Sequence, residues 1–155
     1  MTDEPAAAAP AAGPGGDELW CLADVVDVGL VLPEQYPQVV LRERARPHRE
    51  LRIPLGMAEG MALAYAWRRI GTPRPLTHEL LVDLLARHNI RVEAVRVTAV
   101  HEGTFLAELD TTGPAGRQVV SCRTSDALCT ALRTRPVAPI LVAAWVYDEE
   151  TGPLR

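Results

Sequence analysis

Residues 74–81 read R-P-L-T-H-E-L-L, a segment that begins a predicted helix and concentrates ionisable side chains in one place. Pro75 favours extended geometry in the residue before it, and Thr77 is suited to cap the helix that follows. The apolar face of this helix is predicted to contain Leu80, Leu81, Leu84 and Leu85. His78 and Glu79 then fall in the first turn, where unpaired N–H groups favour a carboxylate or a bound phosphate. The same pattern also fits a capped helix start whose charges are only solvated.

The pattern of apolar residues outside this segment predicts alternating groups of strands and helices. Predicted strands cover residues 19–32, 36–44, 51–55, 92–99, 104–109, 118–122 and 139–147. Predicted helices cover residues 57–69, 77–88 and 126–133. Clustered strands with helices set apart indicate an α+β fold, a single compact domain with mostly antiparallel sheet and three helices. Three strands followed by a helix occur twice, which suggests a duplicated βββα unit.

Single residues refine this prediction at three places. Pro54 cannot donate to a sheet ladder, so its strand is expected at a sheet edge. Gly103 is expected in a tight turn between two strands of a hairpin. Thr124 or Ser125 is expected to cap the third helix, with Asp126 in its first turn, where the helix dipole favours an acid.

Length and composition indicate one domain in the cytoplasm. The chain has 155 residues, 48% of them hydrophobic, which is enough for one core. Residues 1–16, rich in Ala, Pro and Gly, are predicted to be a disordered tail, residues 17–148 the domain, and residues 149–155 a short C-terminal tail. No signal peptide or membrane span is expected, because no basic start or long apolar run occurs. Three cysteines without metal-ligand spacing are expected to be buried thiols in a reducing compartment.

Charge is unevenly distributed along the chain. The net charge is −4, but residues 42–135 carry fifteen Arg and ten acids, a balance of +5, between acidic ends. All sixteen basic residues are Arg, which suits bidentate contact with phosphate and also fits a biased coding composition. The central region therefore permits a polyanionic partner without requiring one.

Three sequence blocks resemble the bifunctional nuclease (BFN, or DUF151) domain family. Residues 74–81 are similar to the family signature R-P-L-T-H-D-L-L, with Glu79 in place of Asp. The segment from Arg123 to Arg133 is similar to the family's R-P-S-D-A-I-A-L-A-L-R, and residues 51–60 to its L-P-I-x-I-G-x-x-E-A. The resemblance extends from about residue 39 to residue 146.

This resemblance implies a nuclease that hydrolyses phosphodiester bonds in DNA or RNA with the help of a divalent metal, Mg²⁺ or Mn²⁺. The chemistry requires an activated water, a positive clamp on the phosphate and usually a metal. The expected catalytic residues are His78, as general base or acid, together with Glu79, Asp126 and Glu59. Arg74 and Arg123 are expected to bind phosphate, and Glu79 and Asp126 to bind the metal.

The sequence is also consistent with two alternative functions. Ser121 stands where the family has an acid, so a family member without nuclease activity, acting as a small-molecule enzyme or a ligand-binding module, is one alternative. An oligomerisation module is the other, because residues 140–146 are apolar on both faces and need covering by helices or by a partner chain. A homo-oligomer is therefore expected.

Overall fold

The computed structural model describes residues 19–151 and has the predicted α+β fold, with seven strands and four helices. The strands are β1 (Trp20–Gly29), β2 (Gln38–Glu43), β3 (Glu50–Pro54), β4 (Arg91–His101), β5 (Thr104–Gly113), β6 (Gly116–Arg123) and β7 (Ile140–Ala143). The helices are α1 (Met57–Trp67), α2 (Thr77–Arg87), α3 (Thr124–Arg133) and α4 (Ala144–Thr151). The tail predicted over residues 1–16 lies outside the described residues, and the predicted domain boundaries stay predictions.

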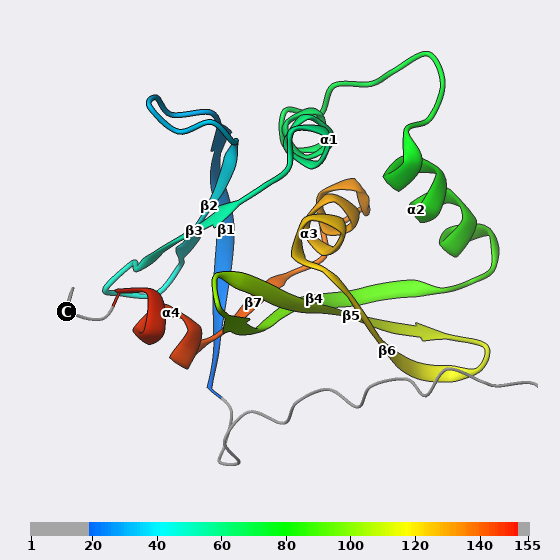
Figure 1. Cartoon of the computed structure of the whole chain (residues 1–155). Helices are drawn as coiled ribbons and strands as arrows, with labels where there is room; N and C mark the ends of the chain where they lie inside the picture. The colour runs from blue at the N-terminus through cyan, green and yellow to red at the C-terminus, as the bar shows by residue number, and fades with distance from the viewer. Residues whose placement is uncertain (1–18, 152–155) are drawn as a thin grey trace, which may run out of the picture.

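All seven strands form one sheet in the order β3-β2-β1-β7-β4-β5-β6. Two antiparallel ribbons, β1 to β3 and β4 to β6, flank β7, which pairs antiparallel with β1 and parallel with β4. β1 runs steeply in Figure 1 whereas β4 and β5 run across it, so the sheet is strongly twisted. Pro54 ends the edge strand β3, as predicted.

The predicted turn between β4 and β5 is confirmed. Glu102 and Gly103 both have positive φ, 49° and 76°, and the hairpin register pairs His101 with Thr104. Two central residues with positive φ define a type I′ turn, whose twist matches that of the flanking strands. The turn therefore fixes the register of the ribbon that ends at Arg123.

The predicted strand over residues 139–147 is wrong in its second half. Only Ile140–Ala143 is a strand, and the chain then forms α4, the fourth helix where three were expected. A continuous apolar run satisfies either a buried strand or a buried helix, so periodicity could not separate them. β7 lies in the centre of the sheet, with Val142 fully buried, so its apolar faces are covered within the chain and do not form an exposed edge.

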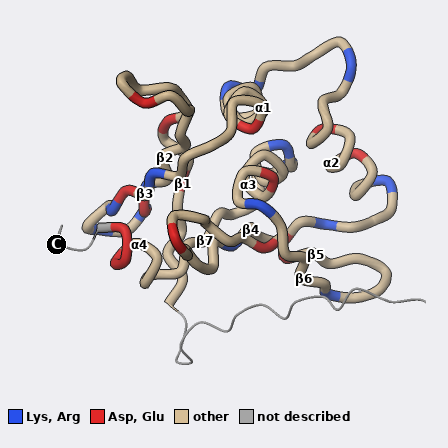
Figure 2. The backbone as a smooth tube through the Cα atoms, in the orientation of Figure 1, with Lys and Arg blue, Asp and Glu red and all other residues tan. Residues whose placement is uncertain are grey.

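Charged residues are dispersed over the fold. Figure 2 shows Arg and acidic residues interspersed along the backbone of the described part of the chain. Many arginines of residues 42–135 form local ion pairs, such as Arg44 with Asp24 and Arg117 with Asp110. Within residues 19–151, no helix is long and apolar enough to cross a membrane.

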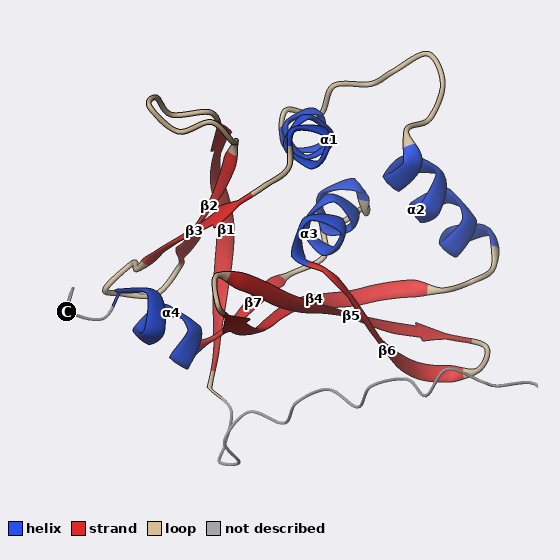
Figure 3. Cartoon of the chain, viewed as in Figure 1, coloured by secondary structure: helices blue, strands red, loops and turns tan. Residues whose placement is uncertain are grey.

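α3 is the central element of the helical layer. It contacts α1, α2 and the strands β4, β5 and β6, and it buries Ala127, Leu128, Cys129 and Ala131. Figure 3 shows α1, α2 and α3 gathered on one side of β4 and β5, while α4 lies apart near β3. The N-terminal ends of α2 and α3 and the first turn of α1 are thereby brought near one another.

A partly buried Arg joins α4 to the hairpin between β2 and β3. Arg49 Nε lies 2.9 Å from Glu43 Oε2, its Nη1 lies 2.6 Å from Asp148 Oδ1, and its guanidinium lies 4.8 Å from the centre of the Tyr147 ring. The hydrogen bond from Arg49 outweighs the effect of burial and lowers the pKa of Glu43 to about 2. The Glu43 side chain is only 6% exposed, so it depends on this partner for its charge.

We expect Arg49→Met to lower the free energy of unfolding by about 3 kcal/mol, because it leaves the buried Glu43 carboxylate unpaired. The matched change Arg42→Met, on the same hairpin, removes a half-exposed pair and should cost less than about 1 kcal/mol. Urea unfolding at neutral pH measures both, and equal losses would contradict this role of Arg49. Because the folded state lowers the pKa of Glu43, its stabilisation is present above the unfolded pKa and is lost as the pH falls toward 2.

Candidate active site

The start of α2 is set by Glu79. Its Oε2 accepts a hydrogen bond from the Leu76 N–H at 2.7 Å, and Leu76, not the predicted Thr77, is the N-cap residue. Glu79 Oε1 also lies 2.8 Å from Arg133 Nη1, whose side chain is only 8% exposed. Glu79 therefore satisfies a free N–H at the helix start and pins α2 to α3.

The start of α3 is set by its connection to β6. Arg123 is both the last residue of β6 and the N-cap residue of α3, so the predicted cap at Thr124 or Ser125 is wrong. Thr124 is buried and donates its hydroxyl to the Phe105 carbonyl oxygen at 2.9 Å, which ties the helix start to β5. The prediction that Asp126 lies in the first turn is confirmed. Because β6 runs directly into α3, Arg123 and Asp126 lie close together at the junction of the two elements.

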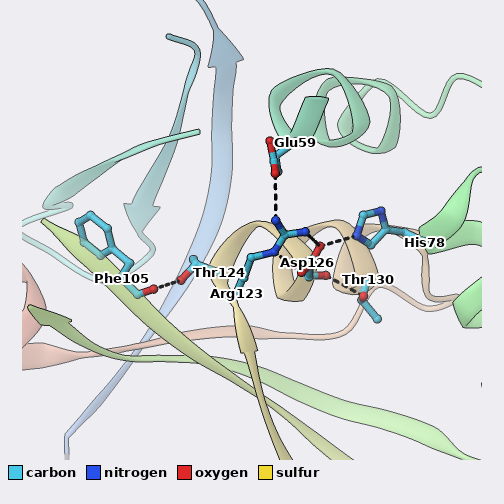
Figure 4. Close-up of polar contacts among 7 residues, drawn as sticks. All are labelled: Glu59, His78, Phe105, Arg123, Thr124, Asp126 and Thr130. Atoms are coloured by element: carbon cyan, nitrogen blue, oxygen red, sulfur yellow. Dashed lines mark hydrogen bonds and ion pairs between the residues drawn. The ribbon is translucent and has the colours of Figure 1, made fainter. Parts of the chain in front are cut away.

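Four side chains from α1, α2 and the β6–α3 junction form one hydrogen-bonded cluster, shown in Figure 4. Asp126 accepts hydrogen bonds from Arg123 Nε to Oδ2 at 2.7 Å and from Arg123 Nη2 to Oδ1 at 3.1 Å. His78 Nε2 lies 3.0 Å from Asp126 Oδ1. Arg123 Nη1 donates to Glu59 Oε1 at 3.0 Å. The order Glu59–Arg123–Asp126–His78 therefore connects three helices through hydrogen bonds.

α1 brings Glu59 to the cluster through its N-terminal turn. Gly56 is the N-cap residue, and a Cβ there would collide with the Glu59 carboxylate. Gly60 is buried against Pro37, where a Cβ would lie 2.5 Å from the proline Cγ. The two glycines allow the close approaches that place Glu59 opposite Arg123.

The electrostatics of the cluster determine the tautomer of His78. Partial burial acts to raise the pKa of Asp126, but the hydrogen bonds from Arg123 and then His78 outweigh it, so the pKa lies below its usual range. An ionised carboxylate only accepts, so the bond to Asp126 assigns the proton to Nε2 of His78. In the neutral imidazole, the lone pair then lies on Nδ1, where it can accept a proton.

Arg123 remains accessible although it is paired. Its side chain is 67% exposed, and three of its five N–H groups are used by Asp126 and Glu59. Two N–H groups therefore have no partner within residues 19–151 and are free to donate to an anion. The hydrogen bond to Asp126 raises the pKa of Arg123, so the guanidinium stays charged.

A hollow of about 410 Å³ beside Phe105 is lined by Glu59 and Arg123 but not by His78. Two further hollows are lined by His78 as well as Arg123. The first, of about 550 Å³, lies between α1 and the start of α2 and includes Met61, Tyr65 and Leu76. The second, of about 640 Å³, lies between α2 and the strands β5 and β6 and includes Leu81, Leu85 and Val120. Both volumes fall within the range of about 300–1,000 Å³ that is typical of ligand pockets. Thr77, His78, Arg123 and Asp126 line both.

The structure brings together four of the six predicted site residues. Glu59, His78, Arg123 and Asp126 meet, whereas Glu79 caps α2 and binds Arg133. Arg74 is exposed, and its side chain has no ion pair within residues 19–151. The sequence interpretation missed the lining of the first hollow, which includes Ala58, Met61, Ala62 and Tyr65. Their spacing of three and four residues is typical of one helix face and would have revealed it.

The carboxylates do not form a ready metal site. Asp126 and Glu59 both bind Arg123, and Glu79 binds Arg133 instead of joining them. No group of three or more His, Cys, Asp or Glu residues within residues 19–151 is placed to hold a metal ion. These donors do not fit Mg²⁺ or Mn²⁺, which prefer several free carboxylate oxygens and waters. The predicted use of such a metal stays a prediction.

A cysteine nucleophile is disfavoured at this site. Cys122 lines the second hollow beside Arg123, but burial raises the pKa of its thiol to about 11. The thiolate is the nucleophilic form, so little of it is present near neutral pH. Cys122 is therefore a poor candidate for a nucleophile in this hollow.

Comparison with known proteins agrees with the sequence blocks. The bifunctional nuclease domain matches residues 39–154 of the chain. Two similar proteins of Mycobacterium tuberculosis are the uncharacterized protein MT1877 of strain CDC 1551 / Oshkosh and the uncharacterized protein Rv1829 of strain ATCC 25618 / H37Rv. Each is 38% identical over 110 residues, which cover 70% of this chain and 64% of the relative. The chain thus spans slightly less than two thirds of the length of each relative.

We expect the Asp126 carboxyl to titrate below the usual range of aspartate, and Arg123→Ala to raise its pKa. The substitution removes the strongest hydrogen bond to the carboxylate but retains most of the burial that opposes ionisation. Carbon-13 NMR of the carboxyl group measures both values. Arg52→Ala, a half-exposed arginine elsewhere in the sheet, should leave the titration unchanged. An Asp126 pKa that is the same in the Arg123→Ala variant as in the unmodified chain would contradict the arrangement.

Proposed function

Because the chain belongs to the bifunctional nuclease domain family, we propose that it hydrolyses phosphodiester bonds in DNA or RNA. The observation that carries the proposal is the Glu59–Arg123–Asp126–His78 cluster between two hollows. It combines an oriented base with an accessible cation, two of the groups that phosphoryl transfer requires. We place the activity in the cytoplasm, which suits three free cysteines, and expect it in a homo-oligomer.

His78 is the proposed general base. Asp126 holds Nε2–H, which orients the imidazole and leaves Nδ1 to accept a proton from a water molecule. The water oxygen bonds to phosphorus as the bond from phosphorus to the leaving oxygen breaks. The leaving oxygen takes a proton from the protonated imidazole or from solvent, so the products are a phosphomonoester and an alcohol. Asp126 stabilises the transient positive charge on His78.

Arg123 is the proposed phosphate clamp. Its two unpaired N–H groups can donate to the non-bridging oxygens, where negative charge is concentrated in the transition state. Glu59 holds the other side of the guanidinium, so the planar group is oriented before the substrate arrives. Arg123 and Asp126 remain bound to each other during the step, because the phosphate uses N–H groups that Asp126 does not.

A second candidate function is supported by the charge of the cluster. One guanidinium lies between two carboxylates, so these three groups together carry a net negative charge, which does not attract a polyanion. A family member without nuclease activity, which acts on or binds a small molecule in the first hollow, would suit this balance. Arg74, which the sequence predicted to bind phosphate, is exposed and is therefore able to contact a phosphate of the substrate.

We expect purified protein to cleave single-stranded DNA or RNA, and His78→Ala to lower kcat by about a hundredfold or more, the usual effect of losing a general base. Arg123→Ala should lower kcat/KM by a similar factor, because it removes the clamp and releases Asp126. Gel-based and fluorescence cleavage assays, each with added Mg²⁺, with Mn²⁺ and with a chelator, provide the measurement.

Matched controls separate the site from general charge effects. His101→Ala removes an exposed imidazole in the β4–β5 turn, and Arg52→Ala removes an exposed arginine of β3. Both should cleave at the rate of the unmodified chain. No cleavage of any nucleic acid under all three conditions, with the protein folded, would favour the second candidate function.

A further inference from the structure

The cluster forms a wall that is shared by the two hollows. Thr77, His78, Arg123 and Asp126 line the hollow beside α1 and also the hollow beside β5 and β6. A group bound at the free N–H donors of Arg123 therefore has a concave space on each side. The substrate proposed above has a matching arrangement, because in a nucleic-acid phosphodiester one phosphate lies between two nucleosides.

The hollow beside α1 suits a flat apolar group. Met61 is 57% exposed, and its side chain lines this hollow together with Tyr65 and Leu76. A tyrosine ring and a thioether provide the type of surface on which a nucleobase stacks. Thr77 adds a hydroxyl group that can donate to or accept from a sugar or a base edge, and Thr72, whose hydroxyl donates to the Arg74 carbonyl oxygen, adds an acceptor.

The hollow beside β6 has a similar mixture of groups. α2 contributes Leu81 and Leu85, and β6 contributes Val120, which is 50% exposed. Gln118 lines the same space and its side-chain amide provides a donor and an acceptor, while the Thr111 hydroxyl donates to the Gln118 carbonyl oxygen at 3.1 Å. No residue of α2 is fully buried, so its leucines are available to contact a ligand in this hollow.

We infer that the two hollows are subsites for the nucleosides on either side of the scissile phosphate, and that the substrate is single-stranded. This inference rests on the proposed function. Bases that are paired in a duplex are stacked along its axis and cannot enter separate hollows without being unpaired and unstacked, which costs free energy. A single strand can place its bases apart at little cost, so the arrangement selects it over a duplex.

The test compares four phosphodiester probes under the same conditions. They are a thymidine dinucleotide, its two analogues in which the 5′ or the 3′ base is absent, and the analogue in which both bases are absent. We expect kcat/KM to fall about tenfold when either base is removed, the typical effect of losing a well-packed group. Cleavage of the analogue without bases reports the chemistry without occupancy of either hollow by a base. Its absence together with that of dinucleotide cleavage would overturn the proposed function itself.

Matched variants then assign each base to a hollow. Val120→Gln changes the hollow beside β6, and Val119→Gln changes the adjacent residue of β6, which is 47% exposed and lies on the opposite side of the strand. Met61→Gln changes the hollow beside α1, and Met57→Gln changes a methionine of α1 that is 53% exposed and one turn away. Each hollow variant should reduce the ratio of cleavage of the dinucleotide to cleavage of the analogue without bases about tenfold, and each control should leave this ratio unchanged.

The outcomes are distinct. The two-subsite arrangement is supported if each hollow variant loses the contribution of only one base to kcat/KM, the 5′ base in one variant and the 3′ base in the other. Cleavage of all probes with no dependence on either base would overturn the inference while leaving the proposed function standing. Equal effects of Val119→Gln and Val120→Gln, or a change in oligomeric state by light scattering without a change in the ratio, would also overturn it. Faster cleavage of a duplex than of the same single strand would contradict the selection for a single strand.

Discussion

The carboxylate of Asp126 is the group on which the site depends. It binds Arg123 through two N–H groups and His78 through Nε2, so one side chain at the start of α3 fixes both the guanidinium and the imidazole. Partial burial makes this charge unfavourable unless both partners are present, and their hydrogen bonds lower its pKa in spite of the burial. Removal of any one partner therefore affects the others, and the four residues act as a unit rather than as separate contributors.

The rest of the fold brings these residues into contact. The β4–β5–β6 ribbon ends directly in α3, which places Arg123 and Asp126 three residues apart at a rigid junction. The Glu79–Arg133 ion pair holds the start of α2 against α3, and so keeps His78 beside Asp126. α1 approaches closely at its glycines and presents Glu59 to Arg123. The sheet thus supports the N-terminal ends of α1, α2 and α3, and these helix ends carry the four residues of the cluster.

The sequence predicted the fold class, the family and the edge position of β3, because each depends on local patterns such as Pro54 or residues 74–81. Glu79 and Arg74 were placed in the site with His78 because their roles were assigned from residue type. In the folded chain, successive residues on a helix point in different directions, and Glu79 turns back to its own N-cap while His78 faces Asp126. The helix α4 was missed because a continuous apolar run lacks a period that separates it from a strand.

The central claim, that Arg123 receives the phosphate while His78 accepts a proton, is tested most directly by observing both side chains in one titration. Side-chain ¹⁵N NMR of the folded chain, with a slowly cleaved phosphorothioate dinucleotide added stepwise, follows the Arg123 Nε–H and the His78 imidazole. We predict that both signals shift along one saturable curve, while the signals of Arg52 and His101 stay in place. Saturable binding that moves neither Arg123 nor His78 would contradict the account.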